Sequence, residues 1–306
     1  MISDSKQHIL ILGVTGFIGS AFFKELKLTS KKAHFHLLIR TKESNLINTP
    51  NCTVYYGDLE TFDWSKLKST PDFVYHFARL NSTKWRKIGR MLATINGKKA
   101  NKRLLAYLNK FAPSSKLYYL SGSLMYGNST APIVEGNKLN PISFAKQYHI
   151  AEKPFIKNQN LNNSVQICLV RVPWVLGNGS WFNGFYKNYI TTNNLVPVYG
   201  KGDNMMSFIT LTELAKHLVE LMTLDFHKSI HISYSKFISQ FEFAKLVSKN
   251  RNLELKKVDL QHFEKAIIEA FTSQIMLTSE IRELKVTPSE LNDKLNSELF
   301  LIFKDI

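Results

Sequence analysis

The first half of the chain alternates short, largely apolar runs with longer segments in which apolar residues recur every three or four positions. Apolar runs bounded by polar residues are typical of buried strands, and the three-to-four spacing is typical of the helices that cover them. Repeated strand–helix order predicts a parallel sheet with helices on both faces. The predicted strands are His8–Leu12, Ala33–Ile39, Cys52–Tyr56, Asp72–Phe77, Lys116–Ser121 and Val165–Val170.

The pattern changes after Pro173. Glycine and asparagine cluster around Gly177, and a stretch rich in Trp, Phe and Tyr runs from Trp181 to Tyr189. We therefore predict an α/β protein with a doubly wound parallel (Rossmann) sheet and a smaller C-terminal α/β lobe. The predicted Rossmann domain is 1–170, with 204–234 returning to it, and the smaller lobe is 171–203 and 235–306.

Composition supports a folded, globular chain. Its 306 residues are 44% hydrophobic and 12% aromatic, enough to bury a large core. The sequence lacks a run of roughly 18 apolar residues that would span a bilayer, and its first residues lack the basic-then-apolar order of a signal peptide. We expect a cytoplasmic protein without a membrane partner. Cys52 and Cys168 lie far apart, which favours neither a disulfide framework nor a metal site.

The net charge of +16 suits a polyanionic partner but does not choose among nucleic acid, acidic lipid and phosphorylated ligands. The densest basic run, 98–103, overlaps a helical stripe formed by Leu104, Leu108 and Phe111. These charges are then the solvated face of a helix. A nucleic-acid-binding motif does not accompany them, so the sequence argues against a nucleic-acid partner.

Three glycines, Gly13, Gly16 and Gly19, follow the first predicted strand, and a helical pattern begins directly after them. The first permits a sharp turn, the second lets the backbone approach a pyrophosphate, and the third lets the helix pack tightly on the sheet. The N–H groups at the start of that helix favour an anion. The segment predicts a dinucleotide phosphate loop, with a plain tight turn as the alternative interpretation.

The end of the second predicted strand indicates which dinucleotide is bound. An NAD-binding chain places a carboxylate about 20 residues beyond the glycines to accept from the ribose 2′-hydroxyl. Here the strand ends in Arg40, Thr41 and Lys42. A guanidinium can pair with a 2′-phosphate through charge-assisted hydrogen bonds. We favour NADP over NAD, while solvated basic residues in an edge loop are the alternative.

Motifs in a fixed order carry a family resemblance. They are Gly13–Gly19, Gly57–Leu59, Val74–Ala78, Asn96-Gly97 with Leu104-Leu105, Leu120–Ser123 with Tyr126-Gly127, Arg171–Pro173 with Gly177, and Ser207–Ile209 with 211–215. Over nearly its whole length the chain resembles the extended short-chain dehydrogenase/reductases, the sugar-nucleotide epimerase and dehydratase group. The resemblance implies that Asp58 and Leu59 flank the adenine, that Phe77 and Ala78 line the cofactor crevice, and that Asn96 braces the sheet. The remaining predicted cofactor residues are Thr15, Phe17, Ile18, Arg79, Tyr148 and Pro173.

The catalytic segment departs from that family. The family uses a serine or threonine, a tyrosine that exchanges a proton with the substrate oxygen, and a lysine four residues after the tyrosine. Here Phe144 takes the tyrosine position and Tyr148 the lysine position. A phenyl ring has no proton to exchange. The serine position holds Gly122, with Ser121 and Ser123 on either side.

A shifted alignment makes Tyr148 the proton donor. Lys153 then follows five residues later, rotated by about 140° from the required face of an ideal helix. A one-residue bulge would restore the pair. The candidate catalytic residues are Ser121, Ser123, Tyr126 and Tyr148.

Two functions stay open. The first is an NADP(H)-dependent oxidoreductase or epimerase-type enzyme that acts on a carbonyl or alcohol with an atypical active site. The second is a catalytically inactive cofactor-binding sensor or assembly partner. The smaller lobe would bind either a nucleotide sugar or an aromatic, polyketide-like ketone. The alternative is that its aromatic rings are core residues and contribute nothing to binding. The sequence leaves open whether the protein forms a homodimer. The candidate substrate residues are Arg171, Trp181, Phe182 and Phe185.

Overall fold

A computed structural model describes residues 6–40, 50–79, 86–161 and 165–304, and only the backbone of 86–90. The chain divides into two compact units, each assembled from separate segments. The first unit comprises Met1–Leu120, Gln147–Leu169 and Leu218–Lys228; the second comprises Ser121–Lys146, Val170–His217 and Ser229–Ile306. The sequence predicts that 204–234 returns to the first domain. In this division, the part of that range that lies in the first unit is Leu218–Lys228.

A seven-stranded sheet runs in the order β10-β6-β5-β4-β1-β2-β3. Its strands are β1 (His8–Leu12), β2 (His34–Ile39), β3 (Cys52–Tyr56), β4 (Phe73–His76), β5 (Lys116–Gly122), β6 (Gln166–Val172) and β10 (Ser229–His231). Strands β1 and β2 pair in parallel, as do β1 and β4. The strand order reverses between β1 and β4, which is the edge where doubly wound sheets bind their ligands. The predicted fold class is confirmed, and the six predicted strands are present: β1 and β3 have the predicted ends, and the other four differ by one or two residues at an end.

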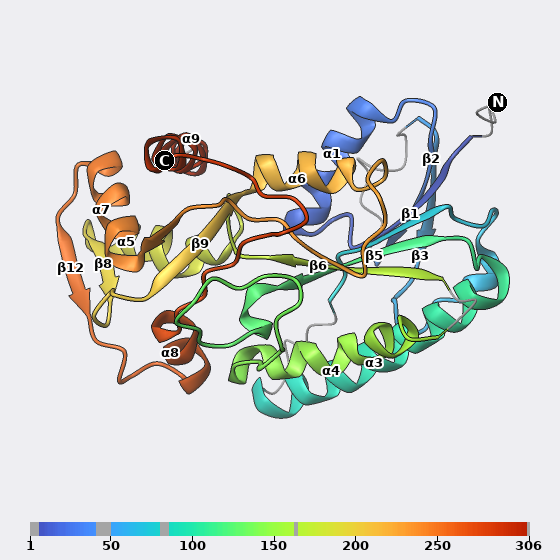
Figure 1. Cartoon of the computed structure of the whole chain (residues 1–306), viewed down its shortest axis with the longest axis horizontal. Coiled ribbons are helices and arrows are strands. Elements are labelled where there is room, and N and C mark those ends of the chain that lie inside the picture. Colours follow the sequence, from blue (N-terminus) through green and yellow to red (C-terminus); the bar gives the residue numbers. More distant parts are fainter. Residues whose placement is uncertain (1–5, 41–49, 80–85, 162–164, 305–306) are drawn as a thin grey trace. The chain divides into compact units, whose positions relative to one another are not determined.

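Helices cover both faces of this sheet, which is why its strands are apolar on both sides. Helix α1 (Phe17–Thr29) lies on one face, while α3 (Arg86–Phe111) and α4 (Ser143–Asn158) lie side by side on the other (Figure 1). Helices α3 and α4 cross closely, since a Cβ added at Gly97 would lie 3.4 Å from the Ala151 Cβ.

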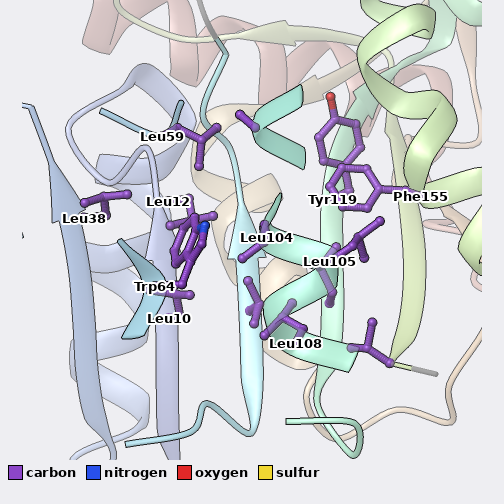
Figure 2. Close-up of a cluster of buried hydrophobic side chains, with 14 of the residues drawn as sticks. Leu10, Leu12, Leu38, Leu59, Trp64, Leu104, Leu105, Leu108, Tyr119 and Phe155 are labelled. Atoms are coloured by element: carbon purple, nitrogen blue, oxygen red, sulfur yellow. The ribbon is translucent and has the colours of Figure 1, made fainter. Parts of the chain in front are cut away.

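The core of the first unit lies between α3 and the sheet. Leu104, Leu105 and Leu108 of α3 pack against strand residues such as Leu10 and Leu12 (Figure 2). Trp64 enters this core from the short 3-10 helix η1 (Trp64–Lys66). Phe111, which the sequence pattern adds to the same stripe, is the last residue of α3 and is 52% exposed.

The second unit has small sheets of its own. Strands β7 (Trp174–Leu176), β9 (Met205–Thr210) and β11 (Phe237–Ser239) form one sheet in the order β11-β9-β7. Strands β8 (Val196–Tyr199) and β12 (Leu255–Val258) form another. Because β9 pairs with β7 and β11, residues 205–210 belong with this unit.

Helices enclose the second unit's sheets. They are α5 (Asn188–Asn193), α6 (Leu211–Glu220, which continues into the first unit), α7 (Gln240–Arg251), α8 (Lys265–Thr272) and α9 (Pro288–Phe303), with short helical turns η2 (Ser123–Met125) and η3 (Asn183–Lys187). Capping boxes begin α7 at Ser239 and α9 at Thr287, as helix starts require. Within the described part of the chain, no helix combines the length and apolarity needed to cross a bilayer.

Two histidines of the central sheet are buried in the neutral state. Burial lowers the pKa of His36 to about 4, and its ring bonds to His8 Nδ1 at 3.0 Å and to the Tyr55 hydroxyl at 3.1 Å. Burial also lowers the pKa of His76 to about 4, at the end of β4. Both rings titrate near 6.5 in the unfolded chain, which therefore binds more protons between about pH 4 and 6.5.

We expect acid to destabilise the fold across that pH range. The stabilisation is fully present above about pH 6.5 and is lost as the pH falls through 4. Replacing His76 by Gln should make the drop in unfolding free energy between pH 7 and 4.5 smaller by about 2 kcal/mol. Chemical denaturation at both pH values measures it. The same change at exposed His262 is the control; an unchanged drop in His76→Gln would contradict the prediction.

Candidate functional site

The glycine loop between β1 and α1 is fixed by close backbone contacts within the first unit. Gly13 has a φ of +85°, and a Cβ there would lie 2.7 Å from the Ala78 backbone nitrogen. A Cβ at Gly19 would lie 2.1 Å from the Gly13 carbonyl oxygen. The fold itself therefore excludes side chains at the first and third glycines.

Gly16 differs from these two glycines. The nearest atom that a Cβ there would meet is the Gly13 carbonyl oxygen, at 3.2 Å. Gly16 is the N-cap of α1. Among the described residues, no side chain caps this helix start with a hydrogen bond, and the first turn contains no acidic residue. The first N–H groups of α1 are thus available to an anion. Thr15 is exposed, and Phe17 and Ile18 are half-buried.

This geometry fits a dinucleotide pyrophosphate. Gly16 is exposed at the helix N-terminus and presents no side chain to a phosphate there, and the tight packing at Gly13 and Gly19 holds that N-terminus against the sheet. Arg40 follows β2 directly and is exposed. Lys42 lies outside the described residues.

A pocket lies in the first unit beside the end of β4. Its lining combines residues from α3, α4 and the segments after β3 and β4. They are Leu59, Ala78, Arg79, Ala93, Thr94, Gly97, Asn101, Tyr119, Gln147, Tyr148 and Ala151. The structure thus brings together four of the sequence-predicted site residues, Leu59, Ala78, Arg79 and Tyr148.

Other predicted cofactor residues lie outside this lining. Asp58 is exposed, and its carbonyl oxygen accepts from Thr61 and Phe62. The Phe77 ring packs on Phe22, with ring centroids 5.0 Å apart. Asn96 is half-buried on α3.

The amide that braces the pocket is Asn101, which the sequence analysis does not single out. Its side-chain oxygen accepts from His76 Nε2 at 2.9 Å, and its NH₂ group donates to the Ala151 carbonyl at 2.9 Å. This buried bridge joins β4, α3 and α4. A signal was present in the sequence, because Asn101 falls on the same helical face as the buried Leu104 and Leu108.

Helix α4 is α-helical throughout Ser143–Asn158, so the bulge that would realign Lys153 does not occur. Lys153 is exposed and is not among the described residues that line the pocket. Tyr148 lines the pocket together with Gln147 and Ala151, while Phe144 is 42% exposed. Tyr148 is the candidate catalytic residue on α4, and it lines the pocket.

The other candidate hydroxyls lie in a buried polar cluster of the second unit. Arg171, 2% exposed, donates to the Ser121 hydroxyl. The Tyr126 hydroxyl lies 2.6 Å from His231 Nε2, and His231 Nδ1 lies 2.6 Å from the Thr278 carbonyl oxygen. Because a carbonyl only accepts, His231 Nδ1 carries the hydrogen and Nε2 accepts from Tyr126. Ser123 is also buried.

Glu135 anchors this cluster. Burial raises the pKa of its carboxyl, but hydrogen bonds from the Ser279 hydroxyl and from the His231 and Glu280 N–H groups outweigh that effect and lower it. Burial lowers the pKa of His231, which keeps the ring neutral. The carboxylate therefore holds the chain around Tyr126 in one arrangement.

Gly122, at the family's serine position, has an ordinary extended backbone. A Cβ there would lie 3.9 Å from the Val172 carbonyl oxygen, the nearest atom it would meet. A side chain would fit at this position.

The predicted substrate aromatics lie in the core of the second unit. Phe182 is fully buried and stacks on Tyr186, with centroids 5.2 Å apart. Trp181 packs on Trp174 and Phe243, and Phe185 packs on Phe271. Pro173 is buried between β6 and β7. For Phe182, this packing agrees with the alternative interpretation, in which the aromatic rings are core residues. Among the described residues, no group of three His, Cys, Asp or Glu side chains could hold a metal ion.

A glycine loop at the switch point of this strand order defines a dinucleotide-binding α/β protein. The chain belongs to the NAD dependent epimerase/dehydratase family, whose model matches residues 9–232. This confirms the predicted family. A comparison with curated protein sequences finds no match.

Solved structures of similar fold include enzymes of nucleotide-sugar chemistry. A UDP-N-acetylglucosamine 4-epimerase from Methanobrevibacter ruminantium, in complex with UDP-N-acetylmuramic acid, is 18% identical with a TM-score of 0.77, covering 99% of this chain and 100% of that chain. A dTDP-glucose 4,6-dehydratase from Bacillus anthracis with NAD is 15% identical (TM-score 0.78; 98% and 97% covered). A UDP-glucuronic acid 4-epimerase from Bacillus cereus with NAD is 18% identical (TM-score 0.75; 97% and 99% covered). At these identities the likeness shows the fold.

Two glycine variants separate folding from ligand binding in the loop. Gly19→Ala places a Cβ 2.1 Å from a backbone oxygen, so we expect it to lower the melting temperature. Gly16→Ala should lower the melting temperature less than Gly19→Ala, because its Cβ would lie 3.2 Å and not 2.1 Å from the Gly13 carbonyl oxygen, and it should weaken dinucleotide binding about tenfold or more, because the added methyl group would face the phosphate. Thermal unfolding and titration with NADPH and NADH measure both. Unchanged affinity in Gly16→Ala would move the binding site away from this loop.

Proposed function

We propose that this protein is an oxidoreductase or epimerase-type enzyme that uses NADP(H) and acts on a carbonyl or alcohol carbon of a nucleotide sugar, with Tyr148 exchanging the proton. The observation that carries the proposal is the position of Tyr148, which lines the pocket together with Ala78, the residue against which the glycine loop packs. Membership of the epimerase/dehydratase family supports the reaction class. The UDP-N-acetylglucosamine 4-epimerase and the dTDP-glucose 4,6-dehydratase of similar fold support a nucleotide sugar over an aromatic ketone as the substrate.

The residues present divide the work. The N–H groups of the α1 N-terminus would bind the pyrophosphate, and Arg40 would pair with the 2′-phosphate. When bound, a nicotinamide cofactor supplies the acceptor or donor of hydride. Tyr148 would pass a proton to or from the substrate oxygen, which is the part of the chemistry that a phenol provides. Asn101 fixes the helix turn that carries it.

A second candidate function has a specific observation in its favour. Phe144 and Gly122 stand at two positions where the family places hydroxyl groups, and losing a positioned acid/base removes about 10²- to 10⁴-fold in rate. The chain would then bind the cofactor as a sensor or assembly partner. Tight binding that discriminates NADPH from NADP⁺, without turnover, distinguishes this function from the first.

Tyr148→Phe tests the enzyme hypothesis. It keeps the ring and removes the hydroxyl, so turnover should fall more than tenfold with little change in NADPH affinity. The assay follows the absorbance of the reduced nicotinamide with UDP- and dTDP-sugars and, because an epimerase returns its cofactor to the starting state, also the conversion of these sugars by chromatography. Tyr56→Phe, at a tyrosine that is 42% exposed on β3, is the matched control and should keep full activity. Full activity in Tyr148→Phe would exclude Tyr148 as the proton donor.

Arg40→Ala tests the choice of NADP. Loss of a charge-assisted bond to the 2′-phosphate should weaken NADPH binding about tenfold or more and leave NADH binding within about threefold. Isothermal titration with both cofactors measures the two affinities. Lys24→Ala, which removes an exposed positive charge from α1, controls for the overall charge of the protein. Equal losses for NADPH and NADH would contradict 2′-phosphate recognition.

A further inference from the structure

Arg79, which is exposed, and the half-buried Tyr148 form a cation–π pair within the first unit. The Arg79 guanidinium carbon lies 4.6 Å from the centre of the Tyr148 ring, and both side chains line the same pocket. A cation over the face of an aromatic ring is attracted by the ring's electron density.

The backbone on both sides of this pair is held by the Asn101 bridge. Arg79 comes three residues after His76, and Tyr148 comes three residues before Ala151. His76 and Ala151 are the two groups that the Asn101 side chain bonds, each at 2.9 Å. Ala78, next to Arg79, is also held by the packing of Gly13. The end of β4 and the turn of α4 that carries Tyr148 are therefore fixed relative to each other.

Arg79 also stands out by charge. Among the described residues that line the pocket, it is the one that is ionised at neutral pH. Helix α4 contributes Gln147, Tyr148 and Ala151 to the lining, whereas Lys153 is exposed elsewhere on the helix surface. The positive charge beside the phenol thus comes from the segment after β4 and not from α4.

We propose that Arg79 is the cation that activates Tyr148: its guanidinium stabilises the negative charge on the phenol oxygen when the proton is exchanged with substrate. This inference rests on the proposed function of Tyr148. In the oxidising direction, the Tyr148 phenolate accepts the proton of the substrate hydroxyl, so that the substrate O–H bond breaks as the phenol O–H bond forms. The carbon that bears this hydroxyl would give its hydride to a bound nicotinamide, so that the carbon is oxidised and the nicotinamide is reduced.

The other titratable side chain among the described residues that line the pocket, and the histidine bonded to Asn101, do not supply this charge. Tyr119 on β5 also lines the pocket, and a tyrosine is neutral or negative. His76 lies behind Asn101, and burial lowers its pKa to about 4, so it is neutral at physiological pH. From α3, the pocket is lined by Ala93, Thr94, Gly97 and Asn101, which are uncharged.

The first test reads the phenol directly, without turnover. Tetranitromethane nitrates tyrosine through its phenolate, so the rate of nitration at Tyr148 in the cofactor-free protein, followed by mass spectrometry, reports stabilisation of that form. Arg79→Met should slow nitration of Tyr148 at least fivefold and Arg79→Lys should restore most of it, while exposed Tyr56 serves as the internal control. Removing the guanidinium can only open access of the reagent to the Tyr148 ring. A slower nitration therefore reports lost stabilisation of the phenolate. An unchanged or faster rate would overturn the proposal.

The second test separates activation from anchoring. Arg79→Met should lower kcat about 10- to 100-fold while KM and the NADPH dissociation constant change less than threefold, and Arg79→Lys should recover much of the loss. A large rise in either constant with kcat retained would make Arg79 an anion anchor and overturn the proposal. If the parent chain turns over none of the sugar nucleotides, the proposed function fails, whereas the nitration rates still decide whether Arg79 stabilises the Tyr148 phenolate.

Discussion

The contact between the glycine loop and the segment after β4 is the constraint on which the first unit depends. Gly13 packs against the backbone of Ala78, and Gly19 packs against the carbonyl of Gly13. These contacts leave no room for side chains, so they fix α1 and the end of β4 at one distance. Everything proposed for the pocket follows from that geometry, because Arg79 is the next residue along the chain. In this fold, the glycine motif that is typical of phosphate binding therefore also positions the backbone that carries the Arg79 cation.

Local patterns in the sequence were enough to predict the elements of the central sheet. Buried strands such as β1 and β4 are nearly continuous apolar runs, and the three glycines mark the ligand edge. Arg79 and Tyr148 could each be predicted as pocket residues from the family motifs. Their pairing could not, because it depends on how α4 lies relative to the end of β4. Asn101 was missed for the same reason: its two partners lie on β4 and α4, far from it in sequence.

The aromatic stretch of the second unit illustrates a different limit. Rings that line a binding site and rings that fill a core are the same residue types, and the sequence offered both interpretations. The full burial of Phe182 against Tyr186 and Phe243 results from the packing of η3 against α7, which no local pattern specifies. The buried cluster of Arg171, Tyr126, His231 and Glu135 is likewise assembled from four separate segments.

The open surroundings of Gly122 and the exposed ring of Phe144 have a consequence for how this chemistry can change. Neither position is occupied by a group on which the core relies: one has space beside it, and the other is partly in solvent. Hydroxyl groups at these positions can therefore be lost or regained with little effect on folding stability. Side chains at these two positions can vary while the glycine loop, which the backbone contacts enforce, stays the same.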